Sequence, residues 1–87
     1  MRSERAEQGS TEKDPWRVRL GRGIAATRTG RQLSRKVLAN HLGVSYHRLA
    51  HWERGGSQPP LAKLIALGRI LEVSTEELLA AGNNCKE

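Results

Sequence analysis

The sequence predicts an all-α fold, a bundle of five short helices that follows a flexible N-terminal arm. Apolar residues recur at spacings of three and four, as they do along one face of a helix. Small polar residues that can cap helices precede these stretches, and glycines follow them. No segment shows the strict alternation of a half-buried strand. Because the chain has 87 residues, we expect one small domain with a compact core.

The composition divides the chain into three parts. Residues 1–14 mix both charge signs and contain no large apolar residue after the first methionine, so they cannot bury enough surface to offset their ordering entropy. This segment is the expected arm. Residues 15–82 should form the domain, which begins where Asp14 can cap a helix and Pro15 suits its first turn. Residues 83–87 should form a short tail.

The first helix should run to about Thr29 and end at Gly30. Its apolar face is expected to consist of residues spaced four apart, namely Trp16, Leu20 and Ile24. Gly23 lies in the middle of this helix and should weaken it by up to ~1 kcal/mol, because glycine is a poor helix former.

The second and third helices each follow a serine that can act as the N-cap. Ser34 should begin the second helix, and Gly43 should allow the sharp turn at its end. The inner face of the second helix is expected to carry Val37, Leu38, Ala39 and Leu42. Ser45 should cap the third helix, which runs through about Glu53. The inward residues of this third helix are expected to be Leu49 and Trp52.

The last two helices follow a loop at residues 55–60, which is rich in glycine and proline. Pro60 should open the fourth helix, which contains the most apolar stretch of the chain. Ser74 and Glu77 have the spacing of a capping box and should begin the fifth helix. We expect this helix to continue through Ala80 and to end at the glycine and asparagines that follow.

The positive charge is concentrated in the middle of the chain. Residues 15–58 contain nine arginine or lysine residues and a single acid, Glu53, for a net charge of +8, whereas the segments on either side each carry −1. Such a concentrated field is typical of a surface that binds a polyanion. Solvated helix faces in an arginine-rich protein would give the same count, so charge alone leaves both readings open.

The segment 33–55 contains two helices of about eight or nine residues, joined by a turn of about three residues. A turn that short makes the two helices cross steeply and leaves the second helix projecting from the surface. In DNA-binding proteins with this arrangement the second helix enters the major groove, which is wide enough to admit it.

This segment and its surroundings resemble the phage-repressor or Cro type of helix–turn–helix protein, also called the XRE family. The match extends without a gap from Leu20 to Leu79, and its most specific motifs are residues 42–45 (LGVS) and 52–55 (WERG). Further matching positions are Gly21, Ile24, Arg28, Leu33, Ser34, Leu38, Ala39, Pro59, Leu61, Leu64, Leu67, Leu71, Val73, Ser74, Glu77 and Leu78. The resemblance implies the five-helix bundle of the lambda-repressor-like (Cro/C1-type) class.

The resemblance also implies roles for particular residues. The recognition helix, at about residues 45–53, should place base-reading side chains in the major groove, namely Ser45, Tyr46, His47, Arg48 and His51. The residues expected to hold phosphates are Ser34, Arg35, Arg54, Gly55 and Ser57. Arg35 stands where many relatives carry glutamine, and its charge should hold a phosphate more tightly. A partly buried ion pair is implied between Arg28 and Glu53.

The side chains expected to read bases are chemically suited to it. Arg48 can form a bidentate contact with guanine, His47 and His51 can donate or accept, and Tyr46 offers a hydroxyl and an aromatic face. Any amphipathic helix exposes a polar face, however, and Arg48 and His51 could contact phosphates instead.

Catalytic and metal chemistry are not expected. His47 and His51 have a spacing that can hold a metal ion, but no acid or cysteine nearby completes a ligand set. The sequence shows no glycine-rich phosphate loop and no nucleophile with a neighbouring base. We therefore expect neither a cofactor nor a bound metal, and we do not expect an enzyme.

No apolar run approaches the ~20 residues that span a bilayer, and the N-terminus lacks the apolar stretch of a signal peptide. The single cysteine, Cys85, cannot form an internal disulfide, which fits a reducing compartment. We expect a cytoplasmic, nucleoid-associated protein with no membrane partner.

The predicted function is sequence-specific binding of double-stranded DNA by a transcriptional regulator, acting as a homodimeric repressor that occludes a promoter. Dimerisation is expected through the fifth helix, whose Leu78 and Leu79 look too apolar for a solvent-exposed end. The alternative is an antitoxin-like or other protein-interaction module of the same fold that binds a cognate partner protein. Capture of a small partner in a 1:1 ratio would favour this alternative.

Overall fold

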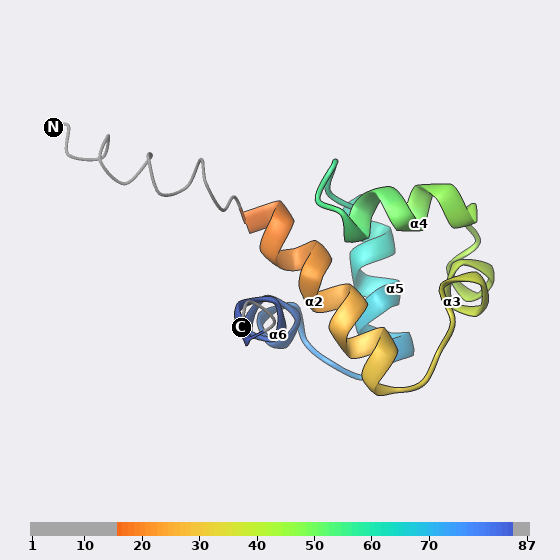
Figure 1. The fold of residues 1–87 in the computed structure, drawn as a ribbon. Helices are drawn as coiled ribbons and strands as arrows, with labels where there is room; N and C mark the ends of the chain where they lie inside the picture. The colour runs from red at the N-terminus through yellow and green to blue at the C-terminus, as the bar shows by residue number, and fades with distance from the viewer. Residues whose placement is uncertain (1–15, 85–87) are drawn as a thin grey trace, which may run out of the picture.

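The computed structural model describes residues 16–84, and this part of the chain consists of five α-helices joined by short loops (Figure 1). The helices are α2 (Trp16–Gly30), α3 (Arg35–Leu42), α4 (Tyr46–Glu53), α5 (Leu61–Leu71) and α6 (Thr75–Asn84). The predicted all-α, five-helix fold is therefore confirmed, and no strand occurs among residues 16–84. The expected arm at residues 1–14, the capping roles of Asp14 and Pro15, and Cys85 lie outside the described residues.

Local capping interactions begin and end α3 and α4 as the sequence predicts. Ser34 Oγ accepts a hydrogen bond from the Val37 N–H at 3.1 Å, and Ser45 Oγ accepts one from the Arg48 N–H at 3.0 Å. Gly43 ends α3 in the left-handed conformation, with φ = 74°, which a residue without a Cβ adopts at little cost. The resulting turn between α3 and α4 contains only three residues.

The capping box of α6 is present, but the helix is longer than predicted. The Ser74 N–H donates to Glu77 Oε1 at 2.7 Å, and the Glu77 N–H donates to Ser74 Oγ at 3.0 Å. The helix then continues through Gly82 to Asn84. A Cβ on Gly82 would overlap the carbonyl oxygen of Arg19, so the glycine allows the last turn of α6 to pack on the backbone of α2.

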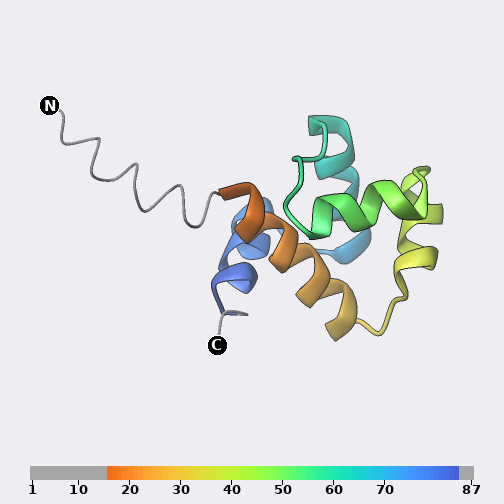
Figure 2. The same cartoon turned by 45° about the horizontal axis from the view of Figure 1, so that its top comes forward.

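Helix α2 lies between α6 and α4 and is approached closely by both (Figures 1 and 2). A Cβ on Gly23 would overlap the Leu78 carbonyl of α6, and a Cβ on Gly21 would lie 2.7 Å from the Glu53 carbonyl oxygen of α4. The sequence analysis considered only the low helix propensity of Gly23, and the structure adds a packing role. Gly23 makes room for the backbone of α6.

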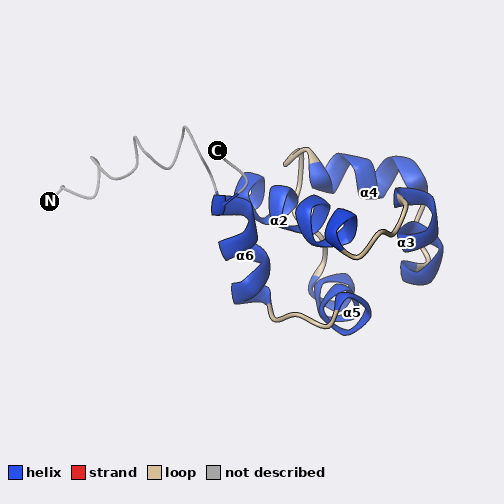
Figure 3. Cartoon of the chain, turned by 60° about the horizontal axis from the view of Figure 1, so that its bottom comes forward, coloured by secondary structure: helices blue, strands red, loops and turns tan. Residues whose placement is uncertain are grey.

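The core draws one or more leucine or isoleucine side chains from every helix. The fully buried ones are Leu20, Ile24, Leu38, Leu49, Leu67, Leu71 and Leu78. Val37, which the sequence analysis placed on the inner face of α3, is 41% exposed, so that prediction was wrong. Because Val37 precedes Leu38 by one residue, it points about 100° away from it around the helix. Figure 3 shows α5 beneath the other helices. Its buried leucines, Leu67 and Leu71, belong to the core cluster.

One of the two leucines expected at a dimer contact is buried within the monomer. Leu78 is completely buried, and Leu79 packs against the same core. Leu78 is therefore used within the monomer, where α6 covers α2, whereas Leu79 is only partly buried. No helix within residues 16–84 combines the length and the apolar character needed to cross a bilayer.

Candidate nucleic-acid interface

Helix α4 has one buried face and one exposed face. Leu49, Ala50, Trp52 and Glu53 are buried. The residues that the sequence analysis expected to read bases are all exposed on the other face, namely Ser45, Tyr46, His47, Arg48 and His51. The steep α3–α4 crossing leaves this face on the outside of the molecule (Figures 1 and 2). This arrangement is the one in which a recognition helix can enter a groove of duplex DNA.

Tyr46 is held in place at the start of α4 by side chains on both sides. Arg35 Nη1 donates a hydrogen bond to the Tyr46 hydroxyl at 3.1 Å, and the Arg35 guanidinium carbon lies 5.5 Å from the centre of the tyrosine ring. The His47 ring meets the Tyr46 ring edge-on, with centroids 5.6 Å apart and planes at 84°. Three exposed or half-exposed side chains thus form one ordered cluster.

A buried carboxylate lies behind this cluster. The Glu53 side chain is only 3% exposed, and its Oε2 accepts a hydrogen bond from Arg28 Nε at 2.8 Å. Arg28 Nη2 lies 3.3 Å from Glu53 Oε1, and Arg28 Nη1 donates to the Leu33 carbonyl at 2.9 Å. The ion pair that the resemblance implied between Arg28 and Glu53 is present, and it fastens α2 to α4.

Arg35 shares the same carboxylate, which the sequence analysis did not anticipate. Arg35 Nε donates to Glu53 Oε1 at 2.9 Å. The hydrogen bonds that Arg35 donates to Glu53 and to Tyr46 raise its pKa above the ordinary value, so the guanidinium stays charged. Its expected role at a phosphate is left to the donors not used in these bonds, the second N–H of Nη1 and the two of Nη2.

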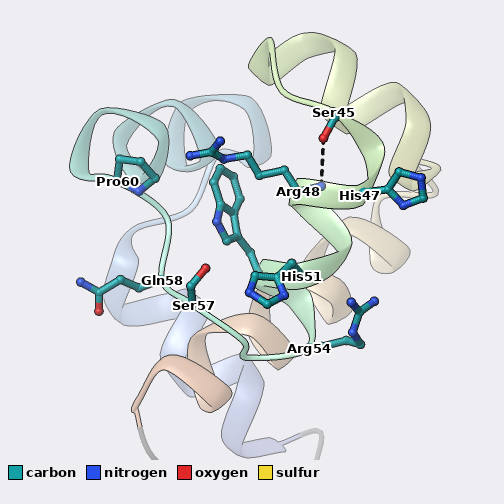
Figure 4. A pocket seen from close by; sticks show the side chains of 9 residues that line it. Ser45, His47, Arg48, His51, Arg54, Ser57, Gln58 and Pro60 are labelled. Carbon is teal, nitrogen blue, oxygen red and sulfur yellow. Dashed lines mark hydrogen bonds between the residues drawn. The ribbon is translucent and has the colours of Figure 1, made fainter.

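An open hollow of about 550 Å³ lies between α4 and the loop that leads to α5 (Figure 4). Its floor includes the ring of Trp52, and the Arg48 guanidinium carbon lies 5.7 Å from the centre of that ring. The far side is formed by Ser57, Gln58 and Pro60. The hollow thus has a cationic wall on the helix and a polar wall on the loop.

The loop amides are only partly available to a phosphate. The Gly55 N–H donates to the Trp52 carbonyl and the Gly56 N–H to the His51 carbonyl, each at 3.0 Å. Gly55 is also buried, because the backbone of α2 at Val18 lies directly against it. The Gly55 amide is therefore already hydrogen-bonded and covered in this structure, and its expected contact with a phosphate stays a prediction. The other expected phosphate residues are at least partly accessible: Ser34 and Arg54 are exposed, and Arg35 and Ser57 are half-buried.

Arg17 was missed by the sequence analysis, and the structure brings it to this loop. Arg17 Nε donates to the Gly55 carbonyl at 3.0 Å, across 38 residues of sequence. No hydrogen bond joins its two Nη groups to the part of the chain that the structure describes. A contact over this separation leaves no local motif, so only the excess of positive charge could have indicated Arg17.

Within residues 16–84 no group of three or more histidine, cysteine, aspartate or glutamate side chains is placed to hold a metal ion. The candidate site therefore consists of exposed hydrogen-bond donors and cations on α4, flanked by cations from α2 and α3.

A steeply crossed helix pair with an exposed second helix defines a helix–turn–helix protein. A family model described as a helix-turn-helix domain matches residues 19–81, and the chain belongs to this family.

Solved structures show the same fold. The clp gene regulator ClgR from Corynebacterium glutamicum superimposes with a TM-score of 0.73 at 23% identity, over 80% of this chain and 74% of that one. A second ClgR structure gives a TM-score of 0.72 at 22% identity, over 83% of this chain and 94% of that one. The restriction-modification controller protein C.AhdI from Aeromonas hydrophila gives a TM-score of 0.66 at 27% identity, over 71% of this chain and 94% of that one. Among curated proteins there is no match.

These likenesses, together with the family match, confirm the identification as a helix–turn–helix regulator fold of the phage-repressor/Cro type.

Proposed function

We propose that this protein is a transcriptional regulator that binds double-stranded DNA in a sequence-specific manner and inserts α4 into the major groove. The observation that carries the proposal is the exposed first turn of α4, where Tyr46 is held by Arg35 and lies beside His47, and where Arg48 is also exposed. Ordered side chains with hydrogen-bonding tips, on a helix that projects from the surface, are what direct base readout requires.

The basic charge supports DNA as the ligand. Residues 15–58 carry a net charge of +8, and the acid among them, Glu53, is buried in an ion pair and adds no negative charge to the surface. We propose that Arg35, Arg54 and Arg17 contact phosphates, together with the hydroxyls of Ser34 and Ser57. Each cation that contacts a phosphate releases counterions, so binding should weaken steeply with salt.

We further propose that the protein acts as a homodimeric, nucleoid-associated repressor in the cytoplasm that blocks a promoter by occupying it. Helix α4 has eight residues and can contact only a few base pairs, so one copy reads a short sequence. Two copies related by a twofold axis would read half-sites about 10 base pairs apart. The contact between the copies must involve a surface other than Leu78, which is buried in the monomer.

Selection from a random duplex library at physiological salt, followed by sequencing, tests the proposal. Enrichment of a short inverted repeat is expected. The variant His47→Ala should lose preference at one base pair of each half-site, with a cost of about 1–3 kcal/mol. Arg69→Ala, a change at an exposed cation on α5 away from α4, should leave the selected sequence unchanged. If the folded wild-type protein enriches no sequence, the proposal fails, and a role in binding a partner protein takes its place.

A further inference from the structure

The side chain of His51 ties the end of α4 to the loop that follows it. A Cβ on Gly56 would overlap His51 Cε1 and would lie 2.5 Å from Nδ1 and 2.6 Å from Nε2, so the imidazole already occupies that space. The edge of the ring that carries both nitrogens therefore faces the loop. We propose that His51 is a positioning residue, which holds this loop ready for a DNA phosphate and does not read a base. The inference rests on the proposed function, because it assumes that DNA is the ligand.

The need for glycine at position 56 comes from this ring. Gly55 has φ = 81°, which favours glycine, whereas the φ of Gly56 lies outside the left-handed range. A residue with a side chain can adopt such a φ. The three atoms nearest to a Cβ on Gly56 all belong to the imidazole of His51. The first glycine thus lets the chain turn, and the second makes room for the ring.

The backbone joins the same two residues. The Gly56 N–H donates to the His51 carbonyl and the Gly55 N–H to the Trp52 carbonyl, each at 3.0 Å. Together these bonds form a Schellman motif, in which a side-chain contact between the outer two positions often accompanies the backbone bonds. His51 makes that contact here. Loss of the imidazole leaves both backbone bonds in place, so α4 should still end normally while the loop loses its side-chain support.

The loop forms one wall of the hollow beside α4, and Figure 4 shows the His51 side chain directed from the helix toward it. Ser57 and Gln58 line that wall, and the guanidinium groups of Arg48 and Arg54 line the same hollow. A phosphate accepts several hydrogen bonds and favours cations, so these groups together suit one. A loop that is ordered before binding loses less conformational entropy when the phosphate arrives. His51 therefore raises affinity through Ser57 and its neighbours.

This role and a base-reading role give different results for the same substitution. A loop that holds a phosphate carries no direct base information, so weakening it should reduce the affinity for all sequences alike. An imidazole that reads a base would instead determine the preference at one base pair. An imidazole that itself contacts a phosphate would need its nitrogens, whereas packing on Gly56 needs only a flat ring.

The experiment combines selection from a random duplex library with affinities measured by fluorescence anisotropy at physiological salt. His51→Ala should select the wild-type sequence but bind it, and its single-base variants, about fivefold more weakly, the effect of about one lost hydrogen bond. Gly56→Ala displaces the ring and should give the same loss. His51→Phe keeps a flat ring without nitrogens and should restore most of the affinity. The matched control is Gly30→Ala, whose Cβ meets no atom within 4 Å and which should bind like the wild type.

A double-variant cycle tests the route through the loop. His51→Ala combined with Ser57→Ala should bind little more weakly than the weaker single variant, because both changes remove the same contact. His51 and Gly56 are exposed, so the variants should fold, which circular dichroism checks. Fully additive losses in the cycle would overturn the inference.

Two further results would overturn it. One is a change of the selected base at a single position in His51→Ala, which would make His51 a base reader. The other is a uniform loss in His51→Ala that Gly56→Ala does not reproduce and His51→Phe does not reverse, which would make the imidazole itself a phosphate contact. In both cases the wild-type protein still selects a sequence, so the proposed function stands. If the wild-type protein selects nothing, the proposed function itself fails.

Discussion

The shared carboxylate of Glu53 gives a prediction that can be worked out from the structure. In Glu53→Gln the side-chain volume and one acceptor oxygen are kept, but the charge of Arg28, which is only 13% exposed, loses its counter-charge. Removing one partner of a buried ion pair costs about 3–5 kcal/mol. The second arginine, Arg35, is 33% exposed and can be solvated, so its bond adds little. We expect the free energy of unfolding to fall by about 3 kcal/mol, the lower end of that range.

Urea unfolding followed by circular dichroism at 222 nm measures this change. The slope of the free energy against urea should stay constant, and Tm should fall by about 12–24 °C for a domain of this size. The control is Arg31→Gln, which breaks the exposed pair between Arg31 and Glu72, where the atoms are 3.5 Å apart and the side chains are 43% and 72% exposed. This control should cost less than about 1 kcal/mol. If Glu53→Gln were as stable as the control, the reasoning from burial would be refuted.

Three further changes test other parts of the structure. Gly23→Ala should lower the free energy of unfolding by about 1–3 kcal/mol, because the added Cβ overlaps α6. Its control is Gly30→Ala, whose Cβ meets no atom within 4 Å and which should raise the free energy of unfolding by up to ~1 kcal/mol. Equal thermal melting points for the two variants would contradict the close approach of α2 and α6. Arg17→Gln should weaken binding to all duplexes alike and reduce the salt slope by about one; a loss confined to one sequence would argue against a phosphate contact. Glu72→Gly should stabilise the protein by about 1 kcal/mol in urea unfolding, because Glu72 ends α5 with φ = 61°; no gain would mean that this conformation costs little.

The features that the sequence predicted are those that depend on neighbouring residues. A serine cap bonds a residue three positions away, as Ser34 and Ser45 do, and the capping box of Ser74 and Glu77 has the same reach. Gly43 likewise ends α3 through its own backbone conformation. The helix order and the helix–turn–helix followed from these local signals, and the family resemblance added the pairing of α2 with α4.

The features that the sequence did not predict depend on contacts between distant residues. In the sequence, Gly23 is recognisable only as a poor helix former. The structure shows that the carbonyl of Leu78, 55 positions later in the chain, packs against it. From the sequence, Leu78 was expected to be exposed near the end of the chain. In the structure it is buried, because α6 covers α2. The bond from Arg17 to the Gly55 carbonyl has no sequence signature for the same reason.

The candidate site was predicted as a set of residues but not as an arrangement. The exposed face of α4 follows from its amphipathic pattern, and the family resemblance implied which of its positions read bases. That Arg35 reaches both Glu53 and Tyr46 could not be predicted, because the crossing of α3 over α4 decides which side chains meet. The assignment of individual residues to bases or phosphates stays a prediction.

The chain of contacts from Arg28 through Glu53 and Arg35 to Tyr46 also bears on how such a protein could be given a new target. Transplanting the exposed residues of α4 onto another helix–turn–helix scaffold would carry Tyr46 across without the partner that orients it. In divergence from a common ancestor, a substitution at position 46 would favour a compensating one at position 35, and positions 35 and 53 would be constrained together. Under the proposed function, operator preference would therefore be set by several helices jointly, rather than by one exchangeable segment.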